Sequence, residues 1–269
     1  MSDALQAAAP KSAGIAPAPG LAHLPLPLFA APMGIGGLGM AWREAARVFG
    51  APAAIGEALM GLAAATWLVI FALHLMRLMR HRDAFAADMK HPIRSAFAGA
   101  ATIGLMLVAA AARPFAEAVA AAIWLVAVVG HLALGAALVR GLLLAPREAA
   151  TLTPALLIPL VGNILAPLIG ARLGFASLSW MLFGIGALLW AMIQPVILWR
   201  LIVGPPLMDR LRPTLVILLA PPAVGSLALA ALTGEWGPAA LAAYGLAAFL
   251  AAALVGLLPG FLAMSFAMS

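Results

Sequence analysis

The chain has 269 residues, of which 65% are hydrophobic and 9% are charged, with 15 Lys and Arg, 9 Asp and Glu and no cysteine. Soluble domains are about 45–50% apolar and about 25% charged, so this composition excludes an ordinary soluble protein. The lack of cysteine excludes disulfides, a thiolate nucleophile and a cysteine metal site. The formal charge of +6 indicates basic loops against anionic lipid headgroups rather than nucleic-acid binding.

Long runs without Asp, Glu, Lys or Arg follow one another along the chain. A helix needs about 20 residues to cross a hydrocarbon core of about 30 Å. Runs near this length lie at 24–42, 58–76, 95–112, 118–139, 153–171, 173–199, 213–234 and 236–269. The last run holds an eighth span and the start of a ninth at Pro259. The sequence therefore predicts an all-α polytopic membrane protein with eight transmembrane helices and the start of a ninth.

The basic residues predict the orientation of these spans, because Lys and Arg are retained on the cytoplasmic side. Loops after odd-numbered spans hold Arg43, Arg47, Arg113 and Arg172. Loops after even-numbered spans hold more: Arg77, Arg80, Arg82, Lys90, Arg94, Arg140, Arg147, Arg200, Arg210 and Arg212. We expect a multi-pass protein of the inner (plasma) membrane with a cytoplasmic N-terminus. Residues 1–22 are predicted to be a disordered cytoplasmic tail, and 23–269 a single transmembrane domain.

Proline and glycine favour the odd-numbered spans. In the fifth span Pro159, Asn163, Pro167 and Gly170 share one helical face. Backbone groups freed by an intramembrane proline need partners from neighbouring protein or from water in a cavity. We therefore expect odd helices to line a central pore and even helices to form an outer wall. The predicted pore-lining residues are Pro32, Gly36, Gly99, Asn163, Pro167 and Pro222. The alternative is that the glycines only permit tight helix packing.

Catalytic signatures are missing from the sequence. It contains no HExxH, no GxSxG and no phosphate-binding loop with its lysine, so we expect no enzyme, no bound metal and no cofactor. His74 and His131 are the one candidate pair for a haem-binding electron carrier. Because His74 lies at the end of its span and His131 near the middle, a shared haem is the least favoured interpretation.

Three stretches carry a resemblance to a known family: Leu28–Arg43 (LFAAPMGIGGLGMAWR), Asp88–Phe97 (DMKHPIRSAF) and Leu211–Gly225 (LRPTLVILLAPPAVG). The chain resembles the tellurite-resistance and C4-dicarboxylate transporter (TDT) family, which includes bacterial TehA and the plant slow-type anion channels. The likeness extends from about residue 25 to the end. The LRP followed by APPA is its most specific part.

The resemblance implies ten helices in five hairpins with quasi-fivefold symmetry, odd helices around a pore, and a homotrimer with one pore per subunit. It also implies an aromatic gate on the ninth helix, which falls on Phe266. Since the chain stops three residues later, at Ser269, we expect it to be C-terminally truncated relative to the family. The partners implied are small inorganic or organic anions and membrane lipids.

The predicted function is a passive anion channel or facilitator that moves small anions through a pore inside each subunit. The alternative is a proton-coupled secondary transporter of C4-dicarboxylate, sulfite or tellurite-type anions. That alternative requires an ionisable residue deep in the path, and the odd-numbered spans hold none.

Overall fold

The computed structural model describes residues 20–145 and 147–263, and all regular secondary structure in these ranges is helical. Its longer helices are α1 (Ala30–Phe49), α2 (Ala53–Arg80), α3 (Arg82–Lys90), α4 (Ala98–Ala112), α5 (Glu117–Leu144), α8 (Ala176–Val203), α9 (Ala220–Thr233) and α10 (Pro238–Val255). The short α-helices are α6 (Leu157–Val161), α7 (Pro167–Gly170) and α11 (Leu258–Leu262). The 3₁₀ helices are η1 (Leu21–His23), η2 (Leu26–Phe29), η3 (Arg94–Phe97), η4 (Ala149–Thr151), η5 (Pro154–Leu156), η6 (Gly162–Leu165), η7 (Ala171–Leu173) and η8 (Asp209–Leu219).

Seven helical segments in the described part of the chain are long and apolar enough to cross a membrane: 53–80, 94–112, 117–144, 154–173, 176–203, 209–233 and 238–255. They correspond to the second through eighth predicted spans. The prediction of a polytopic all-helical membrane protein is therefore confirmed. The count of eight spans, the ninth segment and the quasi-fivefold bundle remain expectations, and the predicted tail falls mostly on residues 1–19, outside the described residues.

The first predicted span, 24–42, is not among the seven and lies in η2 and α1. The helix does not end at Trp42 with the apolar run but continues to Phe49 through three charged residues. One of them, Arg43, forms a two-pronged ion pair with Glu57 of α2, at 2.8 and 2.6 Å. A third bond from Arg43 reaches the carbonyl oxygen of Ala110 at the end of α4. These partners let α1 remain helical past the apolar run.

The spans fall into two groups with different backbones. The outer helices α2, α5 and α8 are each 28 residues of continuous α-helix. The inner spans (26–49, 94–112, 154–173 and 209–233) each begin with a 3₁₀ helix. Each of these 3₁₀ helices contains a proline or follows one closely: Pro27, Pro92, Pro154 and Pro213. Proline fixes φ and removes a backbone donor, so it suits a helix start and disturbs a helix interior. The fifth span, 154–173, is the most broken and alternates between α and 3₁₀ geometry from η5 to η7.

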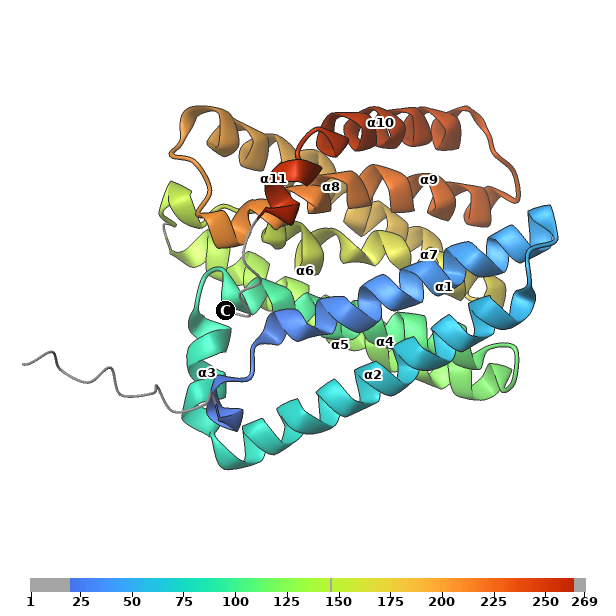
Figure 1. Ribbon diagram of the computed structural model, residues 1–269, viewed down its shortest axis with the longest axis horizontal. Coiled ribbons are helices and arrows are strands. Elements are labelled where there is room, and N and C mark those ends of the chain that lie inside the picture. The colour runs from blue at the N-terminus through green and yellow to red at the C-terminus, as the bar shows by residue number, and fades with distance from the viewer. Residues whose placement is uncertain (1–19, 146, 264–269) are drawn as a thin grey trace, which may run out of the picture.

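The outer helices lie over the junctions between successive inner spans (Figure 1). Helix α2 contacts α1 and α4, α5 contacts α4 and α6, and α8 contacts α6 and α9. Burial follows the same division: 78% of the apolar window is buried in 154–173 and 56% in 94–112, against 22% in α5 and in α8. The 209–233 span is 33% buried and its partner α10 is 11% buried. The third and fifth spans therefore form the buried centre of the bundle, whereas 209–233 is buried little more than the outer helix α2, at 28%. The division of all odd spans inside and all even spans outside remains an expectation.

One end of the bundle gathers the starts of the inner spans and most of the basic loops. Contacts run from η2 to η3, from η3 to η5 and from η5 to η8, and the short helix α3 lies across this end, at the left of Figure 1. The loops here carry ten basic residues, while those at the opposite end carry four. We call it the basic end.

Candidate functional site

The fifth span places an amide in the middle of the inner layer. Asn163 lies in η6 between Pro159 and Pro167, and its side chain is 2% exposed. Its Oδ1 has no hydrogen-bond partner among the described residues. A buried polar atom without a partner costs about 1–3 kcal/mol, so such atoms often mark places that water or a ligand visits.

A second polar junction lies beside Asn163. His131 comes from the outer helix α5, but its fully buried ring points inward, and its Nδ1 lies 2.6 Å from the hydroxyl of Thr102 on α4. The ring packs on Gly162, where an added Cβ would come within 2.7 Å of its Cε1 and Nε2. Nε2 has no hydrogen-bond partner in the described structure. An ionisable side chain therefore stands between the third and fifth spans, although it belongs to the fourth.

The predicted pore-lining residues are all buried, as the burial of Pro32, Gly36, Gly99, Asn163, Pro167 and Pro222 shows. Two of them have close neighbours. An added Cβ on Gly36 would lie 3.1 Å from Leu107, and one on Gly99 would lie 2.9 Å from the backbone of Pro159. These contacts favour tight helix packing for Gly36 and Gly99, and the lining of a pore remains a prediction for all six. Phe266, the predicted gate, lies outside the described residues.

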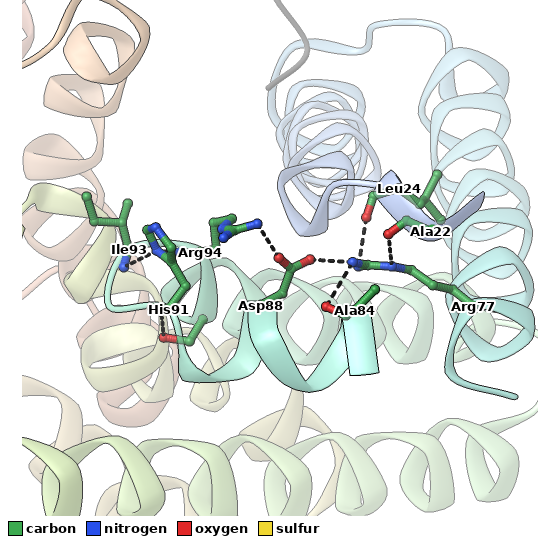
Figure 2. Close-up of polar contacts among 9 residues, drawn as sticks. Ala22, Leu24, Arg77, Ala84, Asp88, His91, Ile93 and Arg94 are labelled. Carbon is green, nitrogen blue, oxygen red and sulfur yellow. Dashed lines mark hydrogen bonds and ion pairs between the residues drawn. The ribbon is translucent and has the colours of Figure 1, made fainter. Parts of the chain in front are cut away.

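A buried ion-pair cluster holds the basic end together (Figure 2). Asp88 of α3 accepts from Arg77 of α2 at 2.6 Å and from Arg94 of η3 at 2.5 Å. The side chains of Arg77 and Asp88 are 3% and 7% exposed, whereas Arg94 is 53% exposed. Arg77 also donates to the backbone oxygens of Ala22, Leu24 and Ala84. The cluster ties the N-terminal segment, an outer helix and the start of an inner span together, and it presents a partly exposed guanidinium at that start.

His91 shapes the turn that leads into η3. Its Nδ1 accepts hydrogen bonds from the backbone N–H groups of Ile93 and Arg94, both at 3.2 Å (Figure 2). Burial and the nearby Arg94 charge lower the pKa of His91, and the Asp88 carboxylate opposes them in part. The neutral ring is the form that accepts both bonds, since protonated Nδ1 is a donor.

His74 and His131 have separate surroundings. The ring of His74 stacks on Phe29 with centroids 5.1 Å apart, whereas His131 contacts Thr102 and Gly162. No group of three or more His, Asp or Glu residues in the described ranges could hold a metal ion. The histidine pair considered for haem does not share a set of neighbours.

Sequence reasoning missed two features of these sites. It counted Arg77 as an orientation signal only, because its partner Asp88 lies across a turn on another helix. It considered His131 only with His74, because no sequence pattern shows that an outer helix directs a side chain between inner spans. The sequence offers one hint for His131, namely Gly162 in the fifth span, a small residue that leaves room for the ring.

Together these features define the class of protein. Apolar helices of spanning length, an inner layer of broken helices and buried polar atoms within it describe a polytopic helical membrane protein with an internal polar layer. Residues 23–269 match the SLAC1 family, which is described as voltage-dependent anion channel. The chain belongs to this family, and the predicted likeness to TehA and the TDT family is confirmed.

A curated relative supports the same assignment. The chain is 26% identical over 200 residues to the tellurite resistance protein TehA homolog of Haemophilus influenzae. The alignment covers 74% of this chain and 61% of the relative. The alignment thus spans less than two thirds of the relative's length, and the family assignment agrees with the multi-pass arrangement of the helices observed.

Proposed function

We propose that the protein is a passive anion channel whose path runs along the inner spans. The observation that carries the proposal is the division of the bundle, since the broken backbones and the unpartnered Asn163 oxygen lie within the inner layer. Pro159 and Pro167 each lack a backbone N–H, so carbonyl oxygens one turn earlier lose their helical partner. Anions bind only weakly in such a path and can leave it quickly. The description of the family as voltage-dependent anion channel supports anion movement.

Charge at the basic end supports anion entry. Arg94 stands at the start of the third span and is half exposed, with Asp88 already shared with Arg77. Arg212 stands at the start of the seventh span with a 54% exposed side chain. Cationic side chains around a mouth raise the local concentration of anions. In this proposal the basic end faces the cytoplasm, Phe266 is the aromatic gate, and the protein works as a homotrimer in the inner membrane.

A proton-coupled anion transporter is the second candidate, and His131 is the observation that favours it. Such a transporter needs an ionisable group deep in the membrane, which the odd spans lack. His131 supplies this group from an even span, because its ring lies between Thr102 and Gly162. C4-dicarboxylate, sulfite and tellurite-type anions remain the candidate substrates of this alternative.

The test uses proteoliposomes containing the purified protein. Channel function predicts an anion-selective reversal potential and flux that follows the anion gradient without a proton gradient. Asn163→Leu should change unitary conductance or anion selectivity severalfold. Gln194→Leu is the matched control, because Gln194 lies on the outer helix α8, where its Oε1 accepts from Trp190 at 2.6 Å. Equal effects of the two variants would count against a path beside Asn163.

A second comparison separates the two candidates. Uphill anion accumulation driven by a proton gradient, lost in His131→Gln, would replace the channel with the transporter. Unchanged passive flux in His131→Gln together with no proton-driven accumulation in the wild type would support the channel. Phe266→Ala should increase the anion current, and an unchanged current would remove the gate from the proposal.

A further inference from the structure

An apolar groove of about 440 Å³ lies between the outer helices α5 and α8. Its lining residues come from α5 (Leu132, Gly135, Ala136, Val139, Arg140, Leu143, Leu144), from the fifth span (Pro159, Leu160, Asn163) and from α8 (Ile185, Leu189). The inner span forms part of its lining, so this groove reaches from the outside of the bundle to the inner layer.

The length of the groove along α5 is close to the thickness of one membrane leaflet. Its α5 residues recur at intervals of three and four from Leu132 to Leu144, and therefore form one helical stripe. Twelve residue steps at 1.5 Å give a length of about 18 Å, which is close to half of a hydrocarbon core of about 30 Å. Since α5 ends at Leu144, the stripe runs from the basic end to about the middle of the bilayer.

Positive charge gathers where the groove meets the basic end. Arg140 lines the groove itself, and the Arg147 guanidinium lies close enough to α5 that a Cβ on Gly141 would be 3.5 Å from it. Neither arginine forms a salt bridge with any carboxylate in the described ranges. At this end of the groove, the two guanidinium groups therefore have no anionic side chain as ion-pair partner among the described residues.

The inner end of the groove has a different chemistry. Asn163 lines it with an amide whose oxygen has no hydrogen-bond partner within residues 20–145 and 147–263, and hydrocarbon cannot satisfy an amide. Mostly apolar residues therefore line the groove from Leu144 to Leu132 and Leu160, and the Asn163 amide marks its inner end. An occupant should have an anionic head at the basic end and an apolar tail of about one leaflet in length.

We propose that this groove binds an anionic glycerophospholipid from the leaflet on the basic side. Its phosphate lies against Arg140 and Arg147, and one acyl chain follows the stripe of α5 and contacts Pro159 and Leu160. Phosphate suits paired guanidinium groups, and the apolar groove supplies the contact area for the chain. The lipid thereby contacts a broken inner span directly. This inference does not depend on whether the protein conducts or transports anions.

The experiment counts bound lipid on the full-length protein in mild detergent by native mass spectrometry during titration with phosphatidylglycerol. Ala136→Phe fills the groove and should remove one bound lipid per subunit. Ala133→Phe is its matched control, because Ala133 is an exposed residue of the same helix outside the groove lining. Arg140→Gln should weaken phosphatidylglycerol binding about 5-fold, as expected for about 1 kcal/mol per basic residue at a membrane surface. Arg80→Gln, at the exposed end of α2, should change it much less.

Several results would overturn the proposal. Equal weakening by Arg140→Gln and Arg80→Gln would indicate general surface charge rather than a site. Equal binding of phosphatidylcholine and phosphatidylglycerol to the wild type would show that the site does not select an anionic headgroup. If Ala136→Phe dissociates an oligomer while the bound lipid is unchanged, the groove is an interface between copies of the chain.

Discussion

The outer helices α2, α5 and α8 each run for 28 residues without interruption, whereas the inner spans change between α and 3₁₀ geometry. Both groups are apolar enough to cross a membrane, with the exception of the span that contains α1. Hydropathy does not separate the groups, and proline does so only in part, because α8 holds Pro195 inside its helix and still runs without interruption. A straight helix satisfies all its backbone groups in lipid, and a broken one needs neighbours, so the broken spans lie inside.

The two groups also differ in the side chains they bring to their contacts. Bulky side chains of the outer helices fill places that inner glycines leave open. Met60 of α2 packs on Gly39, Trp67 of α2 on Gly104, Trp124 of α5 on Gly170 and His131 of α5 on Gly162. Small residues allow close approach of helices in bilayers, where van der Waals packing is a main source of association. The inner glycines therefore join the two layers, and four substitutions can break or sharpen this comparison.

The largest effect is expected at the basic end, where the layers are tied by charge. Asp88→Asn leaves the buried Arg77 without its anion, and breaking a buried pair costs about 3–5 kcal/mol. The control is Asp209→Asn, since Asp209 and Arg212 are 79% and 54% exposed and exposed pairs contribute about 0–1 kcal/mol. Reversible unfolding in mixed micelles, followed by circular dichroism, measures both. Similar losses would show that the Arg77–Asp88 pair does not join the layers.

A smaller effect is expected where an inner glycine meets an outer tryptophan. Gly170→Ala forces a Cβ into the ring of Trp124, and overpacking costs about 1–3 kcal/mol. Gly184→Ala on α8 is the control, because no atom lies within 4 Å of its added Cβ. We expect a lower thermal midpoint, measured by tryptophan fluorescence, for Gly170→Ala only. A tolerated alanine at position 170 would contradict glycine packing as the link between the layers.

The third-largest loss of stability is expected when the Thr102 hydroxyl beside His131 is removed. Thr102→Val removes the contact to His131 Nδ1 and the hydrogen bond that the hydroxyl donates to the Gly99 oxygen. Both ring nitrogens of His131 then lack a partner among the described residues, and each lost bond costs about 1 kcal/mol. Thr151→Val, which removes an exposed hydroxyl bonded to the Glu148 oxygen, should be nearly neutral. The histidine ¹⁵N chemical shifts would report the change at His131. Unchanged shifts in Thr102→Val would show that the Thr102–His131 bond does not form.

The smallest effect is a pH dependence of the turn before η3. Because the pKa of His91 is lowered in the folded protein, its contribution to stability is present above its ordinary pKa of about 6.5 and is lost as the pH falls through the folded value. The protection factors of the Ile93 and Arg94 amides, which compare observed with intrinsic exchange rates, should therefore fall in acid. His91→Asn retains an acceptor that does not titrate and should abolish this fall. A fall in protection that persists in His91→Asn would assign it to another group.

Many residues of the candidate site could be predicted from residue types, but the residues and helices that contact them could not. Asn163 was predicted as a polar residue on the proline face of the fifth span, and it is buried there. Its place at the groove between α5 and α8 depends on which outer helices neighbour the fifth span, and no local pattern contains that information. Gly36 and Gly99 were predicted to line the pore from the same small-residue pattern. That pattern is the same for a glycine at a pore wall and for a glycine where two helices cross, so the sequence cannot distinguish them.

The sequence by itself determined that this chain spans a membrane many times, which spans are broken and which loops are basic, because hydropathy, proline and charge act locally along the chain. Only the tertiary structure decided that His131 of an outer helix stands between inner spans, that Arg77 finds Asp88, and that α5 and α8 leave a groove. These pairings depend on how helices far apart in sequence approach one another, and that approach follows from side-chain shape across the whole bundle.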